Sequence, residues 1–315
     1  MKLDPVIPFE PITTNNPPSS DTWVTQVKWD GVRVLTYCDG NEVKLINRNL
    51  NERTLQYPEL TNMEKYCTAS SFILDGEIIA MDQARPSFTE IMKRDRLKKR
   101  LNIEFAVKQI PVTYMVFDIL YLNGQWVTDA ILAKRQELLE KIIVPSNQVQ
   151  VVKNFTNPLL LLEQMKNYQM EGIICKNLES TYLINGKDSR WQKTKIFHDL
   201  YAVIGGVTLR HNAVNSVLLG VYDQDKLIYI GHAGTGKLKV KDWQELTKRI
   251  QSFIIKERPF DNEPERTKEA IWIRPEITVK VQFMEWTPGG TMRHPSIQSL
   301  VEIPAGECTV NQSTR

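Results

Sequence analysis

The chain is organised around the stretch Thr25-Gln-Val-Lys-Trp-Asp-Gly-Val-Arg-Val34, which lies between two short runs of β-type residues. It brings Lys28, Asp30 and Arg33 close together in the sequence. A half-buried strand rarely carries three charges unless an anion binds there. A desolvated lysine beside other cations is also an amine nucleophile. The alternative is that Lys28 and Arg33 are strand-end charges in water, and this stretch alone leaves both interpretations open.

Two further strands carry carboxylates inside apolar sequence. Residues 71–81 read SFILDGEIIAM, with Asp75 and Glu77 between two apolar runs, and Glu171 opens the run EGIICK. Buried carboxylates are costly unless they bind a cation or accept hydrogen bonds. Strand alternation places Glu171 on the same face as Ile173. We therefore predict a cation site here, with a polar hairpin corner at Asp75 and Glu77 as the alternative.

Paired lysines follow in residues 190–196, which read RWQKTKI. Strand alternation puts Lys193 and Lys195 on one face, together with Trp191. Two neighbouring lysines repel each other, so an anion between them is the economical explanation. The alternative is an edge strand whose lysines face solvent.

The most basic segment is residues 88–101, FTEIMKRDRLKKRL, which we predict to be one helix capped by Ser87. It includes Lys98, Lys99 and Arg100. Such a run is either a face that contacts phosphates or simply a solvated helix face. A second helix is expected at 132–143, with Thr128 or Asp129 available as its cap.

Composition narrows the class of protein. The chain has 315 residues, enough for two domains, and is 42% hydrophobic and 24% charged. It has no apolar run approaching the roughly 20 residues that span a bilayer, and no secretory signal at its start. Four cysteines lie far apart without a C-x-x-C pair, which argues against a zinc site or a disulfide framework. We expect a cytoplasmic protein without a membrane partner, and its net charge of +3 means that any basic surface must be local.

The chain changes character near residue 197. Strands and helices are mixed before it, whereas short strands recur after it around one helix at 240–255, as in a small OB-fold barrel. The prediction is an α+β protein with a first domain at 1–198, an OB-fold domain at 199–308 and a flexible tail at 309–315. The glycine loop at 232–236 does not have P-loop spacing.

With these motifs in order, the chain resembles the ATP-dependent DNA ligases. It is most similar to the minimal two-domain form, as in the ligase domains of bacterial non-homologous end-joining enzymes and small phage-type ligases. The resemblance spans roughly residues 20–300, and the stretch Glu285–Ser296 is similar to the end-joining ligases in particular. It implies an ATP-grasp-like adenylation (nucleotidyltransferase) domain followed by an OB-fold domain.

The resemblance also implies roles for the site residues. Lys28 would be the nucleophile that forms lysyl-AMP, with Asp30, Lys193 and Lys195 as further catalytic residues. The ATP site would comprise Gln26, Val27, Arg33, Arg48, Glu77, Phe117, Ile173, Lys193 and Lys195. Phe117 and Ile173 would sandwich the adenine, Arg33 and Arg48 would hold ribose and phosphates, and Lys193 and Lys195 would favour neutral Lys28. Glu77 and Glu171 would bind Mg²⁺ or Mn²⁺, and Lys98, Lys99, Arg100 and Arg293 would contact DNA.

The substrate implied is nicked or broken duplex DNA, sealed by a monomer of bacterial or phage type that is associated with the nucleoid. A Ku-like end-binding protein is a candidate partner. One departure stands out, because the basic R-x-D-K motif expected after Arg293-His-Pro-Ser296 is replaced by Val301, Ile303 and Pro304. This motivates an alternative, a nick- or end-binding protein with impaired self-adenylation. An RNA ligase or capping-type nucleotidyltransferase is the other alternative.

Overall fold

The computed structural model describes residues 3–82, 85–265, 267 and 269–312. The chain forms two compact units, residues 1–196 and 197–315, so the division falls after residue 196 where the sequence predicts it after residue 198. No helix in the described ranges is long and apolar enough to cross a membrane.

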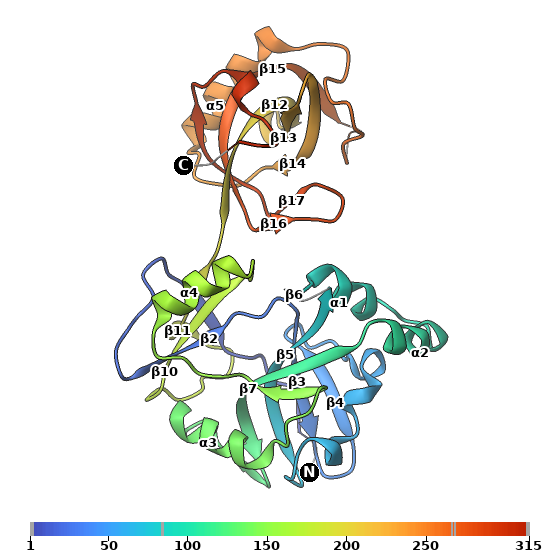
Figure 1. The fold of residues 1–315 in the computed structure, drawn as a ribbon, viewed down its shortest axis with the longest axis vertical. Helices are drawn as coiled ribbons and strands as arrows, with labels where there is room; N and C mark the ends of the chain where they lie inside the picture. Colours follow the sequence, from blue (N-terminus) through green and yellow to red (C-terminus); the bar gives the residue numbers. More distant parts are fainter. Residues whose placement is uncertain (1–2, 83–84, 266, 268, 313–315) are drawn as a thin grey trace. The chain divides into compact units, whose positions relative to one another are not determined.

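The described residues of the first unit form two sheets and four α-helices (Figure 1). The smaller sheet has the order β1-β11-β10-β2, formed by Glu10–Thr13, Lys187–Lys195, Gly172–Asn177 and Trp23–Val27. The larger sheet has the order β4-β3-β5-β7-β8, formed by Val43–Asn47, Val32–Cys38, Phe72–Asp82, Val112–Leu122 and Gln125–Trp126. Strand β6 (Arg85–Pro86) pairs with β5, and β9 (Val149–Val151) pairs with β7. The helices are α1 (Phe88–Asp95), α2 (Arg100–Gln109), α3 (Leu132–Ile142) and α4 (Pro158–Asn167).

Helices and sheets of the first unit enclose three apolar layers. Ile91 of α1 and Leu139 of α3 join the core on one face of the larger sheet. The other face packs toward the smaller sheet, where Leu35 and Trp191 share a second cluster. Helix α4 covers the far side of the smaller sheet through a third cluster that contains Leu161. The space between the two sheets is therefore lined by both, and Lys193 and Lys195 share the face of β11 that carries Trp191.

Turns and close contacts in the larger sheet explain the glycine residues in its sequence. A turn at residues 39–41 joins β3 to β4, with Gly40 at φ 98° and the Asp39 carboxylate accepting from two backbone N–H groups at 3.0 Å. Strand β5 runs unbroken through Asp75, Gly76 and Glu77, so the hairpin-corner alternative is wrong. Gly76 is required because a Cβ there would lie 2.5 Å from the Tyr114 ring.

The predicted helix at 88–101 is two helices. Ser87 does cap α1, accepting from the Glu90 N–H at 3.3 Å. The helix then ends at Asp95, beside the fully buried Arg94, whose guanidinium donates to two backbone carbonyls and pairs with Glu59. These buried polar contacts hold the end of α1, and residues 96–99 turn before α2 begins. Helix α3, by contrast, does not use its expected caps Thr128 and Asp129. Its N-cap residue is Ile131, whose side chain makes no capping hydrogen bond.

In the part of the second unit that the structure describes, a five-stranded sheet is accompanied by one α-helix, as the sequence predicts. The sheet has the order β14-β13-β12-β15-β18, formed by Lys226–Ala233, Ala213–Asp223, His198–Arg210, Ala270–Phe283 and Ser296–Val301. Helix α5 spans Val240–Arg249, and a small hairpin pairs β16 (Glu285–Trp286) with β17 (Met292–Arg293). Leu246 of α5 packs into the core of these strands. The glycine loop serves packing, because a Cβ on Gly236 would lie 1.9 Å from the Ile297 carbonyl oxygen.

The predicted flexible tail is wrong for residues 309–312. The Val310 N–H donates to the Tyr222 carbonyl at 3.0 Å, and the Gln312 side chain exchanges hydrogen bonds with the backbone of Tyr201 at 2.7 and 2.8 Å. These bonds fix the segment against β12 and β13. Residues 313–315 lie outside the described residues.

Candidate active site

Lys28 lies just beyond the end of β2 and faces a shared carboxylate. Its backbone N–H donates to the Gly172 carbonyl at 2.9 Å, and its ammonium pairs with Glu171. Lys195 contacts the other oxygen of the same carboxylate at 3.0 Å. Burial acts to raise the pKa of Glu171, but the two ammonium groups more than offset it and hold the pKa below its usual value. Glu171 thus pairs with the ammonium groups of Lys28 and Lys195 at the same time.

Gly172 determines which way Glu171 points. It adopts φ 144°, so regular alternation does not extend from β10 back to Glu171. Ile173 packs with Leu161 under α4, whereas Glu171 meets Lys195 on the opposite face. The prediction that Glu171 and Ile173 share a face is therefore wrong.

Gly172→Ala should remove this geometry. The new Cβ would lie 2.1 Å from the Thr194 carbonyl oxygen at a φ that L residues rarely adopt. Backbone strain alone costs about 1–3 kcal/mol. We expect a lower urea midpoint and loss of the AMP uptake that the resemblance implies. Gly306→Ala, where no atom lies within 4 Å of the new Cβ, should match the parent in both measurements, and equal effects of the two changes would contradict the packing argument.

The paired lysines lie on an interior strand. Strand β11 pairs with β1 on one side and β10 on the other, so the edge-strand alternative is wrong. Register places Lys193 opposite Ile174, and Trp191 opposite Lys176. Burial, followed by the charges of Lys195 and Lys28, lowers the pKa of Lys193. Two ammonium groups thus pair with the Glu171 carboxylate, and the charge of Lys193 acts on both of them, an arrangement suited to phosphate.

Glu77 adds a second carboxylate from the larger sheet. It lies opposite Arg33 in the β3–β5 register. Burial raises the pKa of Glu77 to about 8, against the opposing fields of Lys28 and Arg33, while Glu171 and Asp30 raise it further. Asp30 itself is half-buried. The charges of Lys28, Glu77 and Glu171 therefore interact in one place.

Arg33 is not free to hold a phosphate in this structure. Its guanidinium binds Asp75 through two hydrogen bonds of 2.9 and 2.6 Å and donates to the Phe9 carbonyl at 2.7 Å. The Tyr182 hydroxyl donates to the same carboxylate at 2.8 Å. Arg48 is exposed just after β4, and no described contact joins it to the lysine cluster.

The predicted adenine slot needs one correction. Ile173 lies on the α4 side of the smaller sheet, and Ile174 instead occupies the face shared with Lys193 and Gln26. The Val27 side chain also packs on the α4 side. Gln26 is buried and donates to Asn154 at 2.9 Å. Ile174, and not Ile173, therefore lies on the face of the smaller sheet that also carries Trp191, whose ring contacts Phe117.

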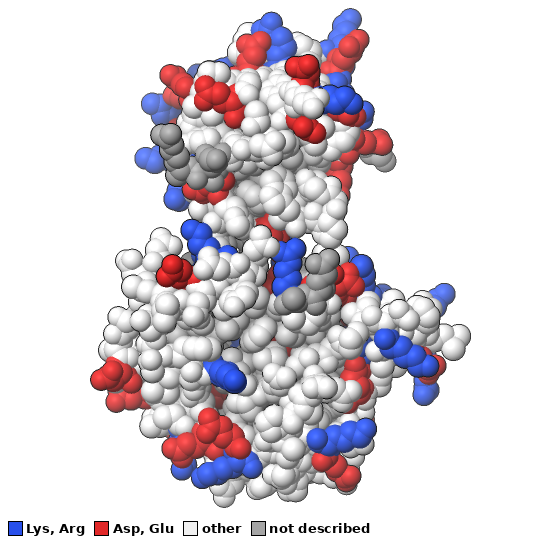
Figure 2. Space-filling view, in the orientation of Figure 1, with Lys and Arg blue, Asp and Glu red and all other residues white. Residues whose placement is uncertain are grey.

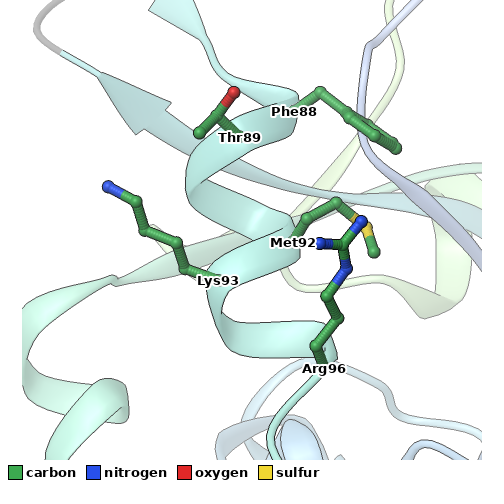
Figure 3. Close-up of a pocket in the computed structure, with 5 residues that line it drawn as sticks. All are labelled: Phe88, Thr89, Met92, Lys93 and Arg96. Carbon is green, nitrogen blue, oxygen red and sulfur yellow. The ribbon is translucent and has the colours of Figure 1, made fainter. Parts of the chain in front are cut away.

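The predicted DNA contacts differ in accessibility. Lys98, Lys99 and Arg100 are all exposed, whereas Arg293 pairs with Glu285 at 2.6 Å and has a side chain only 15% exposed. A pocket of about 270 Å³ lies along α1, lined by Phe88, Thr89, Met92, Lys93 and Arg96 (Figure 3). On the face drawn in Figure 2, positive and negative side chains are intermingled.

Sequence reasoning missed two residues of this region. Lys176 is 1% exposed, with Nζ 4.0 Å from the centroid of the Trp191 ring and 4.1 Å from that of Phe117. Tyr182, besides its bond to Asp75, accepts from the Phe9 N–H at 3.0 Å. Strand alternation could have placed Lys176 in this region, because it follows Ile174 by two positions on β10 and therefore shares its face.

The carboxylates fit a magnesium ion bound together with a nucleotide. No group of three or more His, Cys, Asp or Glu side chains forms a metal cage among the described residues. Mg²⁺ commonly takes one or two carboxylates and completes its shell with substrate phosphates and water. Glu77 and Glu171 provide that number of hard oxygen ligands.

Fold and site together define a nucleotidyltransferase domain followed by an OB-fold domain. Residues 11–195 match the model of the ATP dependent DNA ligase domain, and residues 210–302 match the ATP dependent DNA ligase C terminal region. The chain therefore belongs to the ATP-dependent DNA ligase family.

Relatives agree with this assignment. The chain is 27% identical over 286 residues to the multifunctional non-homologous end joining protein LigD of Mycolicibacterium smegmatis, covering 88% of this chain and 36% of that protein. It is 28% identical over 330 residues to a DNA ligase of Methanothermobacter thermautotrophicus, covering 95% and 56%. The chain thus spans about a third to a half of these relatives.

Solved structures show the same fold. A mycobacterial DNA ligase D solved with ATP and MES matches with a TM-score of 0.53 and 25% identity, covering 96% of this chain and 98% of that one. A Lig E DNA ligase matches with a TM-score of 0.62 at 18% identity, covering 93% and 99%. The second match supports the fold alone.

Proposed function

We propose that the chain is an ATP-dependent DNA ligase that seals duplex DNA through AMP carried on Lys28. The observation that supports this most is the cluster of Lys28, Glu171 and Lys195 beside Glu77, between the two sheets of a domain that belongs to this family. A nucleophilic amine, two flanking cations and two carboxylates suit phosphoryl transfer, which depends on positioning and on neutralising charge.

In the proposed first step, neutral Lys28 Nζ attacks the α-phosphorus of ATP. A P–N bond forms, the bond to the β-phosphate oxygen breaks, pyrophosphate leaves, and the amine proton passes to solvent. Lys193 and Lys195 would stabilise the phosphate oxygens. Bound Mg²⁺ or Mn²⁺, held by Glu77 and Glu171, would supply further charge neutralisation.

In the second step, an oxygen of the DNA 5′-phosphate attacks the same phosphorus, the P–N bond breaks and Lys28 regains a proton. In the third, the 3′-hydroxyl oxygen attacks the activated 5′-phosphate and its proton passes to solvent, a phosphodiester bond forms, the bond to the AMP phosphate breaks and AMP leaves. The adenine would stack against Phe117 on one side and Ile174 on the other. Arg33 would contribute to the site by holding the Asp75 carboxylate in place.

The test is intact-mass measurement before and after addition of ATP with Mg²⁺, followed by nicked DNA. An AMP adduct that disappears when nicked DNA is added and yields sealed product would support the proposal. A protein that arrives unadenylated and gains no adduct would overturn it.

A second candidate follows from Val301, Ile303 and Pro304, where the relatives' basic motif is expected. Val301 ends β18, and its carbonyl accepts from the Thr278 hydroxyl at 2.8 Å, so the strand is formed with an apolar residue at this position, and Ile303 and Pro304 follow it. The candidate is a nick-binding protein with impaired self-adenylation. It predicts no adduct from ATP but sealing of a pre-adenylated nick, and an RNA nick tests the RNA-ligase alternative in the same assay.

The physiological setting is part of the proposal. LigD relatives carry an end-joining name, which favours broken ends as a substrate and a Ku-like protein as a partner. We also propose that the chain acts as a monomer associated with the bacterial nucleoid. Co-sedimentation on blunt-ended DNA with and without a purified Ku protein would test the partner.

Lys98 and Lys99 would contact DNA phosphates, because both are exposed between α1 and α2. Lys98→Glu with Lys99→Glu should weaken nicked-DNA binding and reduce the slope of log affinity against log salt by about 0.9 for each phosphate that is no longer neutralised. Lys141→Glu, an exposed lysine on α3, is the matched control. An unchanged slope in the double variant would mean that this segment is a solvated face that does not contact DNA phosphates.

A further inference from the structure

Lys176 is a buried lysine for which the proposed chemistry gives no role. It lies on the face of β10 that carries Ile174, and its register partner on β11 is Trp191. Its ammonium lies over the rings of Phe117 and Trp191, at 4.1 and 4.0 Å from their centroids. The two rings meet edge to face at 6.0 Å, and Lys176 lies closer to both than the Arg33 guanidinium carbon, which is 5.3 and 5.8 Å from the Phe117 and Trp191 centroids.

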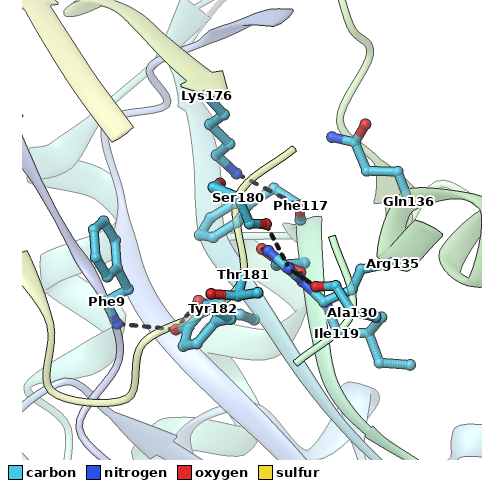
Figure 4. A network of polar contacts seen from close by, with 12 residues as sticks. Phe9, Phe117, Ile119, Ala130, Arg135, Gln136, Lys176, Ser180, Thr181 and Tyr182 are labelled. Carbon is cyan, nitrogen blue, oxygen red and sulfur yellow. Dashed lines mark hydrogen bonds and ion pairs between the residues drawn. The ribbon is translucent and has the colours of Figure 1, made fainter. Parts of the chain in front are cut away.

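The ammonium has few polar partners. Among the described residues it donates to one oxygen, the Phe117 carbonyl, at a long 3.5 Å, and no carboxylate pairs with it. Figure 4 shows this contact beside the network around Tyr182 and Arg135. A lysine ammonium carries three donors, so the aromatic faces supply most of its stabilisation. Lys176 thus holds both the ring and the backbone of Phe117.

The charged groups that face Lys176 nearly cancel. Asp75 of β5 is paired with Arg33 of β3, and Asp118 of β7 is paired with Arg135 of α3. Burial lowers the pKa of Lys176 to about 7, with Asp118 and Asp75 opposing the change and Arg33 and Arg135 adding to it. The charged form is therefore populated below about pH 7 and lost as the pH rises through that value.

We propose that Lys176 is a positioning residue that holds Phe117 for stacking on adenine, and that it does so in its protonated form. The inference rests on the proposed function for the identity of the base. A cation over one ring of the stack orients that ring and stabilises it, and the neutral amine loses this attraction. Adenine-nucleotide affinity should then fall as the pH rises through the neutral range.

The test is the affinity of α,β-methylene-ATP, which cannot transfer AMP, between pH 6 and 8.5. Protonation of the ligand and of other site groups affects the parent and the variants alike. The ratio of parent to variant affinity therefore reports the pH dependence that comes from Lys176. Lys176→Met should bind about 3- to 10-fold more weakly than the parent at pH 6, because it lacks the desolvated cation–π interaction. The ratio should approach one at pH 8.5.

Two further variants separate positioning from a purely structural role. Lys176→Arg keeps the charge and should bind as the parent does at pH 6 while remaining tight at pH 8.5. Lys176→Gln is a second neutral variant in case the methionine protein does not fold. Lys166→Met, an exposed lysine on α4, should give a ratio of one throughout.

A ratio that stays constant across the pH range for both neutral variants would overturn the inference. This outcome is distinct from failure of the proposed function. That failure would appear as a parent protein that forms no Lys28 adduct with ATP, whatever its affinity for the analogue.

Discussion

Lys28→Ala should form no AMP adduct with ATP and Mg²⁺, a loss of more than about 10³-fold in the first step, because alanine has no nucleophile. The measurement is intact mass after incubation with ATP, which resolves one adenylate on the chain. Glu171 keeps Lys195 as a partner at 3.0 Å, so the substitution does not leave a buried carboxylate unpaired. The folded variant should therefore remain available for the assay.

Lys28→Arg distinguishes the nucleophile from the charge. Arginine is large enough to reach Glu171 and remains protonated, so it preserves the ion pair without an amine that attacks phosphorus. It should also take up no AMP. Lys141→Ala, an exposed lysine on α3, should be adenylated as the parent is. Lysyl-AMP detected in either Lys28 variant would show that another residue carries the nucleotide.

The sequence predicted the strands that hold the site because each is a regular run with its charges in a clear pattern. Strands β2 and β3 on either side of Lys28, the continuous β5, and the lysine pair on β11 all appear where the pattern places them. The alternation rule failed at Gly172, where a left-handed backbone reverses the direction of the preceding side chain. Ile174, rather than Ile173, consequently shares the face of Lys193.

The remaining differences come from pairings between residues distant in sequence. Arg33 finds Asp75 on the neighbouring strand, and no local pattern distinguishes such a partner from a phosphate. Lys176 is stabilised by Phe117 and Trp191, which come from two other strands, so its environment exists only in the folded chain. Arg293 was predicted to contact DNA, but in the structure it forms an ion pair with Glu285 across a hairpin. In each case the charge was visible in the sequence and its partner was not.

The second large effect is expected on stability, from the ion pair between Arg135 and Asp118. Both side chains are 0% exposed, and the guanidinium makes two hydrogen bonds to the carboxylate at 2.7 and 2.9 Å. It also donates to the Ala130 carbonyl at 2.6 Å. Arg135→Met should lower the free energy of unfolding by about 3–5 kcal/mol, because it leaves a buried charge without its partner. The measurement is the free energy of unfolding in urea, taken from the spectroscopic transition of the first unit.

The neighbouring residue supplies a matched control. Lys134 pairs with Glu137 at 2.8 Å on the same helix, but both side chains are 55% exposed. Lys134→Met should therefore change the free energy of unfolding by less than about 1 kcal/mol. Equal losses from the two substitutions would mean that burial does not govern the strength of these pairs in α3.

Removing both partners tests the cause of the loss. Most of the cost of Arg135→Met should come from the abandoned carboxylate of Asp118 rather than from the pair itself, because bringing both charges out of water is expensive. Arg135→Met combined with Asp118→Leu should then recover much of the lost stability. A double variant as unstable as the sum of its single changes would instead show that the pair contributes through its hydrogen bonds, including those from Arg135 to the loop that carries Ser180.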